Sequence, residues 1–328
     1  MSEAIIQVNG LSKTYRVPHR GEGLVESVKS LFHRSYQDVQ AVRDIHFSIQ
    51  AGEIVGFIGP NGAGKTTTLK MLAGLLHPSN GEAVIAGYIP WERKTGYLQS
   101  ISMVLGNKSQ MLWDIPPLDT FHVLGEIYQV PRIEYRQTLD ELVELLDMRE
   151  LLSRPVRNLS LGERMKCELV AGLLHRPKVM FLDEPTLGLD VSMQTRLRQF
   201  LKEYNQRSGA TMILTSHYMA DVTTLCPRVI LIHHGQLIYD GELVGLSKRL
   251  APFKIIRFSV INGGTGIDVP PGVDLLPQED DRIAWRTSRE DAPSITAHLL
   301  KNVSLADLTV EDPPIEAVID QIYSEGGL

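Results

Sequence analysis

One stretch of the sequence constrains the fold more than any other. Residues 59–66 read GPNGAGKT and fit the pattern G-x-x-x-x-G-K-[ST]. An apolar segment, 53–58, precedes this stretch, and a segment with apolar residues at helical spacing, 65–76, follows it. Glycines let backbone N–H groups point inward around phosphate groups, and the start of a helix adds a favourable partial charge. The sequence therefore predicts a strand, a phosphate-binding loop and a helix in direct succession.

The loop also supplies two side chains with distinct chemistry. The Lys65 ammonium is a mobile cation suited to the outer phosphates, and the Thr66 hydroxyl suits Mg²⁺. The residues expected to contact nucleotide here are Gly59, Pro60, Asn61, Gly62, Ala63, Gly64, Lys65, Thr66 and Thr67. Because kinases, GTPases and many ATPases share such a loop, it does not by itself decide the reaction.

A pair of carboxylates narrows the choice. The apolar run 179–182 ends in Asp183 and Glu184, which Pro185 follows. At the carboxyl end of a buried strand, Asp183 can hold the coordination shell of Mg²⁺. Glu184 projects differently and can polarise an attacking water as general base. This pair favours hydrolysis of a bound nucleotide.

Strands and helices are expected to alternate along most of the chain, which predicts an α/β fold with a parallel or mixed sheet. We expect strands over 5–8, 41–49, 53–58, 179–182, 211–215 and 229–232. We expect helices over 65–76 and 191–206, and a largely helical region from 116 to 175. Segment 10–15 is expected to turn out of the first strand. In the polar segment 16–40, apolar residues between 24 and 32 recur at helical spacing.

Pro252 marks a boundary, which divides the chain into a main domain, 1–250, and a small α+β appendage, 251–328. A Gly/Pro-rich loop, 263–272, interrupts the appendage. Its expected strands and helices lie at 255–260, 282–286, 294–300, 305–310 and 315–323.

Composition excludes several classes of protein. The formal net charge of −6 makes non-specific nucleic-acid binding a poor expectation, because such binding needs clustered cations. Two cysteines, Cys167 and Cys226, exclude a disulfide framework and favour a reducing compartment. No stretch approaches the roughly 18 to 20 apolar residues that cross a bilayer, and residues 1–10 do not resemble a secretion signal.

An ordered set of motifs over residues 5–246 resembles the ABC transporter ATPase family. The loop 59–66 resembles Walker A, 180–184 resembles Walker B, 188–190 resembles the D-loop, and LSLGE at 159–163 resembles the signature LSGGQ. This resemblance implies a P-loop NTPase fold of the ABC type, with a helical subdomain at about 107–176 and with ATP and Mg²⁺ as cofactors. It implies a head-to-tail dimer with a second copy or a homologous ATPase subunit, in which the signature helix of one subunit closes the other's site.

The resemblance also implies residue roles. Tyr15 would stack on adenine, and Ser160 and the Gly162 N–H would donate to the partner's γ-phosphate. The implied catalytic residues are Glu184, His217, Lys65 and Asp190. Further nucleotide contacts are expected from Asn107, Ser160, Leu161, Gly162 and Glu163, and the implied metal ligands are Thr66, Asp183 and Asn107.

Three positions depart from the family pattern. Leu161 and Glu163 stand where the signature normally has Gly and Gln, and the added carboxylate should weaken closure unless a cation such as Arg164 or Lys166 answers it. Asn107 stands where the family has a Gln and is one methylene shorter. Gln110 is the alternative candidate for that role if the loop is shifted.

The stretches 106–117 and 161–168 resemble the ATPase subunits of ABC-2-type systems, which are mostly exporters. The chain would then lie at the cytoplasmic face of a membrane, bound to permease subunits on separate chains. A groove floored by Met111, Leu112 and Trp113, or the segment 16–40, could contact the permease; ordinary packing is the alternative for both. Rival functions are a non-transport ABC protein and a regulatory ATPase with weak turnover.

Overall fold

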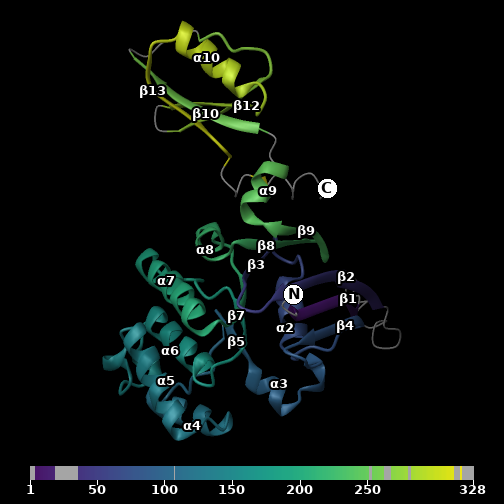
Figure 1. Ribbon diagram of the computed structural model, residues 1–328, viewed down its shortest axis with the longest axis vertical. Coiled ribbons are helices and arrows are strands. Elements are labelled where there is room, and N and C mark those ends of the chain that lie inside the picture. The colour runs from purple at the N-terminus through teal and green to yellow at the C-terminus, as the bar shows by residue number, and fades with distance from the viewer. Residues whose placement is uncertain are drawn as a thin grey trace, which may run out of the picture. The chain divides into compact units, whose positions relative to one another are not determined.

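The structure is a computed structural model that describes residues 4–18, 36–106, 108–250, 253–261, 267–279, 282–313 and 318–319. It divides the chain into two compact units, residues 1–240 and 241–328 (Figure 1). None of the helices in the described ranges is long and apolar enough to cross a membrane.

A six-stranded sheet with the order β5-β6-β7-β3-β8-β9 forms the centre of the first unit. Its strands are β3 (Ile54–Ile58), β5 (Ile101–Leu105), β6 (Val179–Asp183), β7 (Thr211–Thr215), β8 (Arg228–His233) and β9 (Gln236–Glu242). From β5 to β8, neighbouring strands pair in parallel. The loops after β3, β5, β6 and β7 therefore leave from one edge of the sheet, where ligands bind in open α/β folds.

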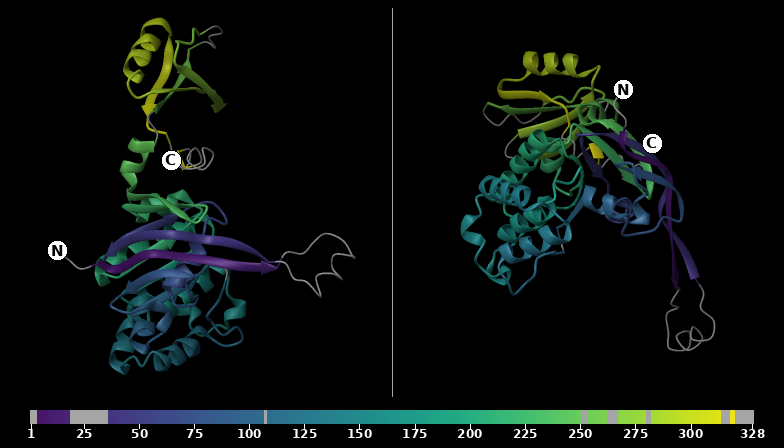
Figure 2. Two further views of the ribbon diagram at one scale, coloured as in Figure 1. Left: turned by 90° about the vertical axis from the view of Figure 1, so that its right-hand side faces the viewer. Right: turned by 60° about the horizontal axis from the view of Figure 1, so that its bottom comes forward.

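A three-stranded antiparallel sheet, with the order β2-β1-β4, accompanies the parallel sheet. Its strands are β1 (Ala4–Pro18), β2 (Tyr36–Gln50) and β4 (Asn80–Ile85), and Figure 2 shows β1 and β2 as a long paired ribbon. The helices α2 (Lys65–Leu72) and α3 (Thr95–Ser100) follow β3 and β4 in the chain. One apolar core joins this sheet, α2 and the parallel sheet through residues that include Ile6, Leu11, Phe57, Leu69, Phe181 and Ile230.

Two local expectations about the first unit are wrong. Segment 10–15 does not turn away, because irregularities in the pairing at Val8/Leu11 and at Lys13 let β1 continue to Pro18. The helix expected over 65–76 ends at Leu72, and Gly74 follows with a φ of +69°. The helical spacing at 24–32 lies outside the described residues, whereas the two ends of segment 16–40 belong to β1 and β2.

A layer of helices lies beside the parallel sheet. It contains α4 (Pro117–Ile127), α5 (Arg132–Leu145) and α6 (Leu161–Leu173), which Figure 1 shows grouped together. Helices α7 (Val191–Ser208) and α8 (Met219–Leu225) follow β6 and β7. Burial runs from Met165 to Leu173 along α6, so this helix is packed on nearly all sides.

The second unit is a small α+β fold. It begins with the end of β9 and contains α9 (Leu243–Leu250), β10 (Phe253–Val260), β11 (Val273–Glu279), β12 (Arg282–Ser288), α10 (Ala292–Asn302) and β13 (Leu305–Glu311). The strands pair antiparallel in the order β11-β12-β10-β13. Phe258 and Trp285 meet edge to face in its core, with ring centroids 4.9 Å apart. The sequence did not predict β11, and most of the helix expected at 315–323 lies outside the described residues.

Candidate active site

The phosphate-binding loop connects β3 to α2, and its glycines are required by packing as well as by shape. A Cβ at Gly59 would lie 2.3 Å from the Ile232 carbonyl oxygen, and one at Gly64 would lie 2.5 Å from that of Ala41. Gly62 meets nothing but has a φ of +79°, a conformation that favours glycine. Neighbouring backbone thus holds the loop in its curved shape.

Lys65 stands at the start of α2 with its ammonium inside this loop. Its Nζ donates to the carbonyl oxygens of Gly59, at 2.6 Å, and Pro60, at 3.0 Å. Burial lowers the pKa of Lys65, and the charges of Glu184 and Asp183 oppose that shift. The loop therefore presents a partly desolvated cation close to both predicted carboxylates.

Two hydroxyl groups converge on Asp183 at the end of β6. Thr66 Oγ1 donates to Asp183 Oδ1 over 3.2 Å, and Thr215 Oγ1 donates to the same oxygen over 2.7 Å. A carboxylate and hydroxyl oxygens are the kind of ligands that Mg²⁺ prefers, so these residues fit that ion. Thr215 was not among the predicted site residues, although its position at the end of an apolar strand, two residues before the predicted His217, is a signal that could have identified it.

Glu184 and His217 meet directly. The distance from His217 Nε2 to Glu184 Oε1 is 2.7 Å, and the Glu184 side chain is 20% exposed. Glu184 has a φ of +54°, and its N–H donates to the backbone oxygen and to the hydroxyl of Thr215 at 3.1 Å each. A non-glycine residue held in this sparsely populated conformation is often part of a functional site.

The loop after β5 packs against the same two carboxylate residues. Gly106 N–H donates to the Asp183 carbonyl over 2.9 Å, and a Cβ at Gly106 would lie 2.1 Å from the Glu184 carbonyl oxygen. Asn107 lies outside the described residues. The alternative candidate, Gln110, uses its side-chain amide to donate to the Met103 carbonyl over 3.2 Å. Gln110 therefore points along β5, and this geometry disfavours it as a substitute.

The signature residues form the start of α6 as a capping box. Glu163 N–H donates to Ser160 Oγ over 3.3 Å, and the Glu163 carboxylate accepts from Ser160 N–H over 2.7 Å. The bond from the Ser160 backbone is the largest of several effects that lower the pKa of Glu163. Glutamate at this position thus has a local structural role.

The cation that forms an ion pair with Glu163 is neither of the two that were expected. Arg154 Nη1 lies 3.4 Å from Glu163 Oε1. Arg164 instead lies over the ring of Trp113, 5.1 Å from its centroid, so the expectation for Arg164 is wrong. Lys166 acts on Glu163 only through its charge, more weakly than Arg154.

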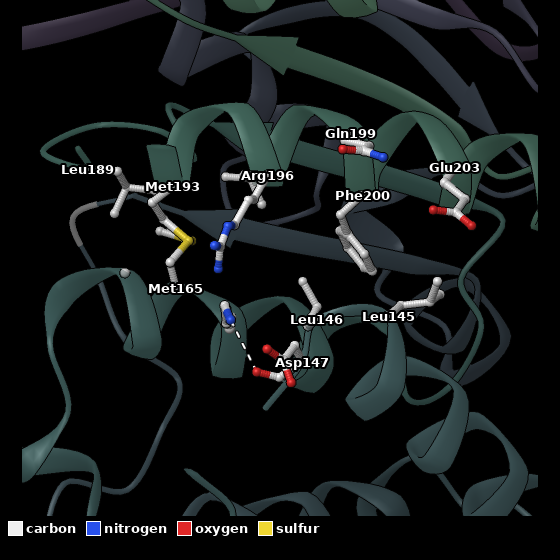
Figure 3. A pocket seen from close by; sticks show the side chains of 13 residues that line it. Leu145, Leu146, Asp147, Met165, Leu189, Met193, Arg196, Gln199, Phe200 and Glu203 are labelled. Carbon is white, nitrogen blue, oxygen red and sulfur yellow. Dashed lines mark hydrogen bonds between the residues drawn. The ribbon is translucent and has the colours of Figure 1, made fainter. Parts of the chain in front are cut away.

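A cavity of about 310 Å³ lies behind the signature turn, between α6 and α7 (Figure 3). Lys166 lines this cavity and donates to the Asp147 carbonyl over 3.3 Å. Gly162 and Met193 also line the cavity, and a Cβ on Gly162 would meet Met193 at 3.1 Å. Leu161 lies next to the D-loop, 3.0 Å from where a Gly188 Cβ would be. The signature residues therefore pack against Met193 and the D-loop beside this cavity.

The remaining predicted residues are distributed around the site. Tyr15 lies on β1 with 37% exposure, and Lys13 Nζ is 5.4 Å from the centroid of its ring. Asp190 caps α7, accepting from Met193 N–H over 2.9 Å. Thr67 is half-buried in the first turn of α2. Burial raises the pKa of both thiols, Cys167 and Cys226, consistent with structural roles.

Comparison with known proteins decides the family. Residues 42–187 match the family described as ABC transporter. Over 217 residues the chain is 35% identical to the ABC transporter ATP-binding protein NatA of Bacillus subtilis (strain 168), an alignment that covers 65% of this chain and 88% of NatA. This chain belongs to the ABC transporter family.

A longer match extends into the second unit. The chain is 28% identical over 302 residues to the linearmycin resistance ATP-binding protein LnrL of Bacillus subtilis (strain 168), covering 86% of this chain and 93% of LnrL. The fold is shared with the dimeric post-hydrolysis structure of the ATP-binding cassette MJ0796 bound to ADP and Pi, with a TM-score of 0.59, 21% identity, and coverage of 72% and 98% of the two chains.

The ABC protein described here is therefore an ATP-binding subunit and an ATPase with a single nucleotide-binding domain, homologous to drug-resistance ATPases of the ABC-2 type. Its fold is that of a P-loop NTPase, as predicted. Of the predicted site residues, Lys65, Thr66, Asp183, Glu184 and His217 form one connected cluster. Among the described residues, no hydrogen bond or ion pair that we find joins the signature residues 160–163 to this cluster.

Proposed function

We propose that this chain hydrolyses ATP as a head-to-tail homodimer and energises export through separate ABC-2-type permease subunits at the cytoplasmic face of a membrane. One observation carries the catalytic part of the proposal. The side chains of Glu184 and His217 meet at 2.7 Å, adjacent to Asp183 and within the electrostatic reach of Lys65. A base, its partner and a phosphate-binding cation are thus assembled at one edge of the sheet.

Each residue of the cluster has a chemical task. The loop N–H groups and Lys65 bind the phosphates, and Glu184 accepts the proton of the attacking water. His217 holds the Glu184 carboxylate at Oε1 and leaves the other oxygen for that proton. Thr66 and Asp183 would hold Mg²⁺, which when bound supplies positive charge that stabilises the phosphates.

The capping box supports a role for the signature in a dimer. The first-turn N–H groups of α6 and the Ser160 hydroxyl lie where an anion is favoured. The MJ0796 cassette, whose fold this chain shares, is described as a dimer. Because Arg154 and the Ser160 N–H compensate the Glu163 carboxylate, its charge is a weaker argument for a slow regulatory ATPase.

A hydrophobic cavity of about 470 Å³ beside β5 is the surface that we propose for the permease. It is lined by exposed or half-buried apolar residues, among them Leu75, Leu98, Met103, Leu105, Ile127 and Tyr128. The predicted groove residues lie elsewhere: Met111 is buried, and Trp113 lines a different cavity with Arg164.

The division into a main domain, 1–250, and an accessory domain, 251–328, stays a proposal.

The dimer proposal is tested with Glu184→Gln, which keeps the size of the side chain but removes the base. Sedimentation of the purified chain with ATP and Mg²⁺ is expected to show a stable dimer for Glu184→Gln and a monomer for the same variant without ATP. Lys65→Ala is the control, which should stay monomeric because it cannot bind ATP. A Glu184→Gln chain that stays monomeric at saturating ATP would exclude the head-to-tail dimer.

A further inference from the structure

A buried carboxylate that no motif identifies bonds to residues that are close in sequence to Glu184 and His217. Asp221, in the first turn of α8, is 0% exposed. Its Oδ2 atom accepts a hydrogen bond from Thr186 Oγ1 and another from Ser216 Oγ, each 2.5 Å long. Both hydroxyl residues are buried as well. One oxygen atom therefore joins the segment after β6 to the segment after β7.

The two residues joined in this way flank the proposed catalytic pair. Thr186 follows Glu184 by two positions, and Ser216 directly precedes His217. The Ser216 hydroxyl also accepts from the Tyr218 N–H over 3.0 Å, so both sides of His217 are fixed to the same group. The contact between Glu184 and His217 thus has a second connection beside it, which runs through Asp221.

The surroundings of Asp221 explain why the residue is a carboxylate. Arg198 Nε on α7 lies 3.6 Å from Asp221 Oδ1, and its own hydrogen bond goes to the Gln194 carbonyl. A carboxylate oxygen accepts two O–H donors more strongly than an amide oxygen does. Asparagine would also turn an NH₂ group toward Arg198 or toward the two hydroxyls. A buried polar group that bonds several neighbours holds those neighbours in one arrangement.

We propose that Asp221 is a positioning residue, which holds the segment bearing His217 in register with the segment bearing Glu184. The inference rests on the proposed roles of Glu184 and His217 in hydrolysis. Asp221 itself touches neither ATP nor water in this account. It keeps the Glu184 carboxylate and the His217 imidazole within hydrogen-bond reach while the phosphate-binding loop binds nucleotide independently.

The two hydrogen bonds to Asp221, from Thr186 and from Ser216, are called the Asp221 bridge. The test removes these two bonds one at a time and together. Thr186→Val, Ser216→Ala and the double variant are compared in steady-state ATP hydrolysis, with Thr138→Val as the matched control. Thr138 is also a buried threonine whose hydroxyl bonds one side chain, that of Arg176, but it lies on α5 in the helical layer.

Each single variant is expected to lower kcat about tenfold with KM for ATP changed less than about twofold, because small misplacements of catalytic groups are costly. The double variant should also lose about tenfold, since either change already breaks the bridge. In imidazole ¹⁵N spectra, the Nε2 resonance of His217 should shift in these variants. Thr138→Val should leave both kcat and that resonance unchanged.

Two results would overturn the proposal. Single variants with kcat within about twofold of the wild type would show that the bridge does not position the pair. Losses that multiply to about a hundredfold in the double variant would show two independent effects. Glu184→Gln in the same assay distinguishes failure of the proposed function from failure of the proposed role of Asp221. If Glu184→Gln retains turnover, the catalytic assignment of Glu184 fails. If only the bridge variants retain turnover, the positioning role of Asp221 fails and the catalytic assignment stands.

Discussion

Glu168 offers a quantitative test of how the signature helix is attached to the segment beyond β5. This carboxylate on α6 is 4% exposed and accepts from the Ser109 hydroxyl, from Gln110 N–H at 3.0 Å and from Met111 N–H at 3.4 Å. No motif in the sequence indicates this contact. It fixes the segment in which Gln110 lines the proposed permease cavity.

Replacing Glu168 by leucine leaves Ser109 O–H and Gln110 N–H without this acceptor, whereas Met111 N–H keeps a bond to Ser109 Oγ at 3.1 Å. Each orphaned donor costs about 1–3 kcal/mol, and partial access to water at this exposed segment reduces the sum to about 2–3 kcal/mol. Glutamine keeps one acceptor oxygen but turns an NH₂ toward Gln110 N–H, which costs about 1 kcal/mol.

Thermal unfolding converts these free energies into measurable shifts. In a unit of this size, 1 kcal/mol lowers Tm by about 2–4 °C, so Glu168→Leu should lose about 4–12 °C and Glu168→Gln about 2–4 °C. Glu150→Leu, at an exposed position, is the control and should shift Tm by less than about 2 °C. A Glu168→Leu protein as stable as this control would refute the view that Glu168 fastens the segment.

Three further predictions concern the active site and the permease surface. The folded state lowers the pKa of Glu163, so the ionised carboxylate stabilises the folded chain above the pKa of the unfolded state, and this stabilisation is lost as pH falls through the folded pKa. Glu163→Ala should therefore lower the free energy of unfolding by about 1 kcal/mol at pH 7. The Tm difference between wild type and this variant should shrink below about pH 4. Gly106→Ala should lower ATP turnover at least about tenfold, since its Cβ would displace the Glu184 carbonyl; a wild-type rate would contradict that packing. Ile127→Lys should reduce co-purification with membrane subunits without changing basal ATPase activity, whereas Ile133→Lys, also exposed and on α5, should not reduce it. Equal capture by both variants would exclude this cavity as the docking surface.

Much of the catalytic cluster could be predicted because its chemistry is encoded in short segments. Lys65 and Thr66 belong to one loop, and Asp183 and Glu184 end one apolar strand. Parallel strands bring such segments to a common edge, so residues 117 positions apart, Thr66 and Asp183, meet without any long-range signal in the sequence.

The supporting contacts could not be predicted for the same physical reason. The partners Glu163 and Arg154, and likewise Asp221 and Thr186, are ordinary charged or polar residues whose pairing depends on how helices and loops pack. The continuation of β1 past Gly10 was missed because a glycine that forms an irregularity in a strand resembles a turn in sequence.

The central claim is that Glu184 accepts the proton of the water that attacks ATP. Phosphate release by the purified chain with saturating ATP and Mg²⁺ tests it directly, with wild type and Glu184→Gln measured side by side and nucleotide binding checked in both. The account predicts ATP binding at least as tight as in the wild type, because ATP stabilises the dimer of this variant, and a loss in rate of about 10²–10⁴-fold for Glu184→Gln. Turnover within about threefold of the wild type would contradict it.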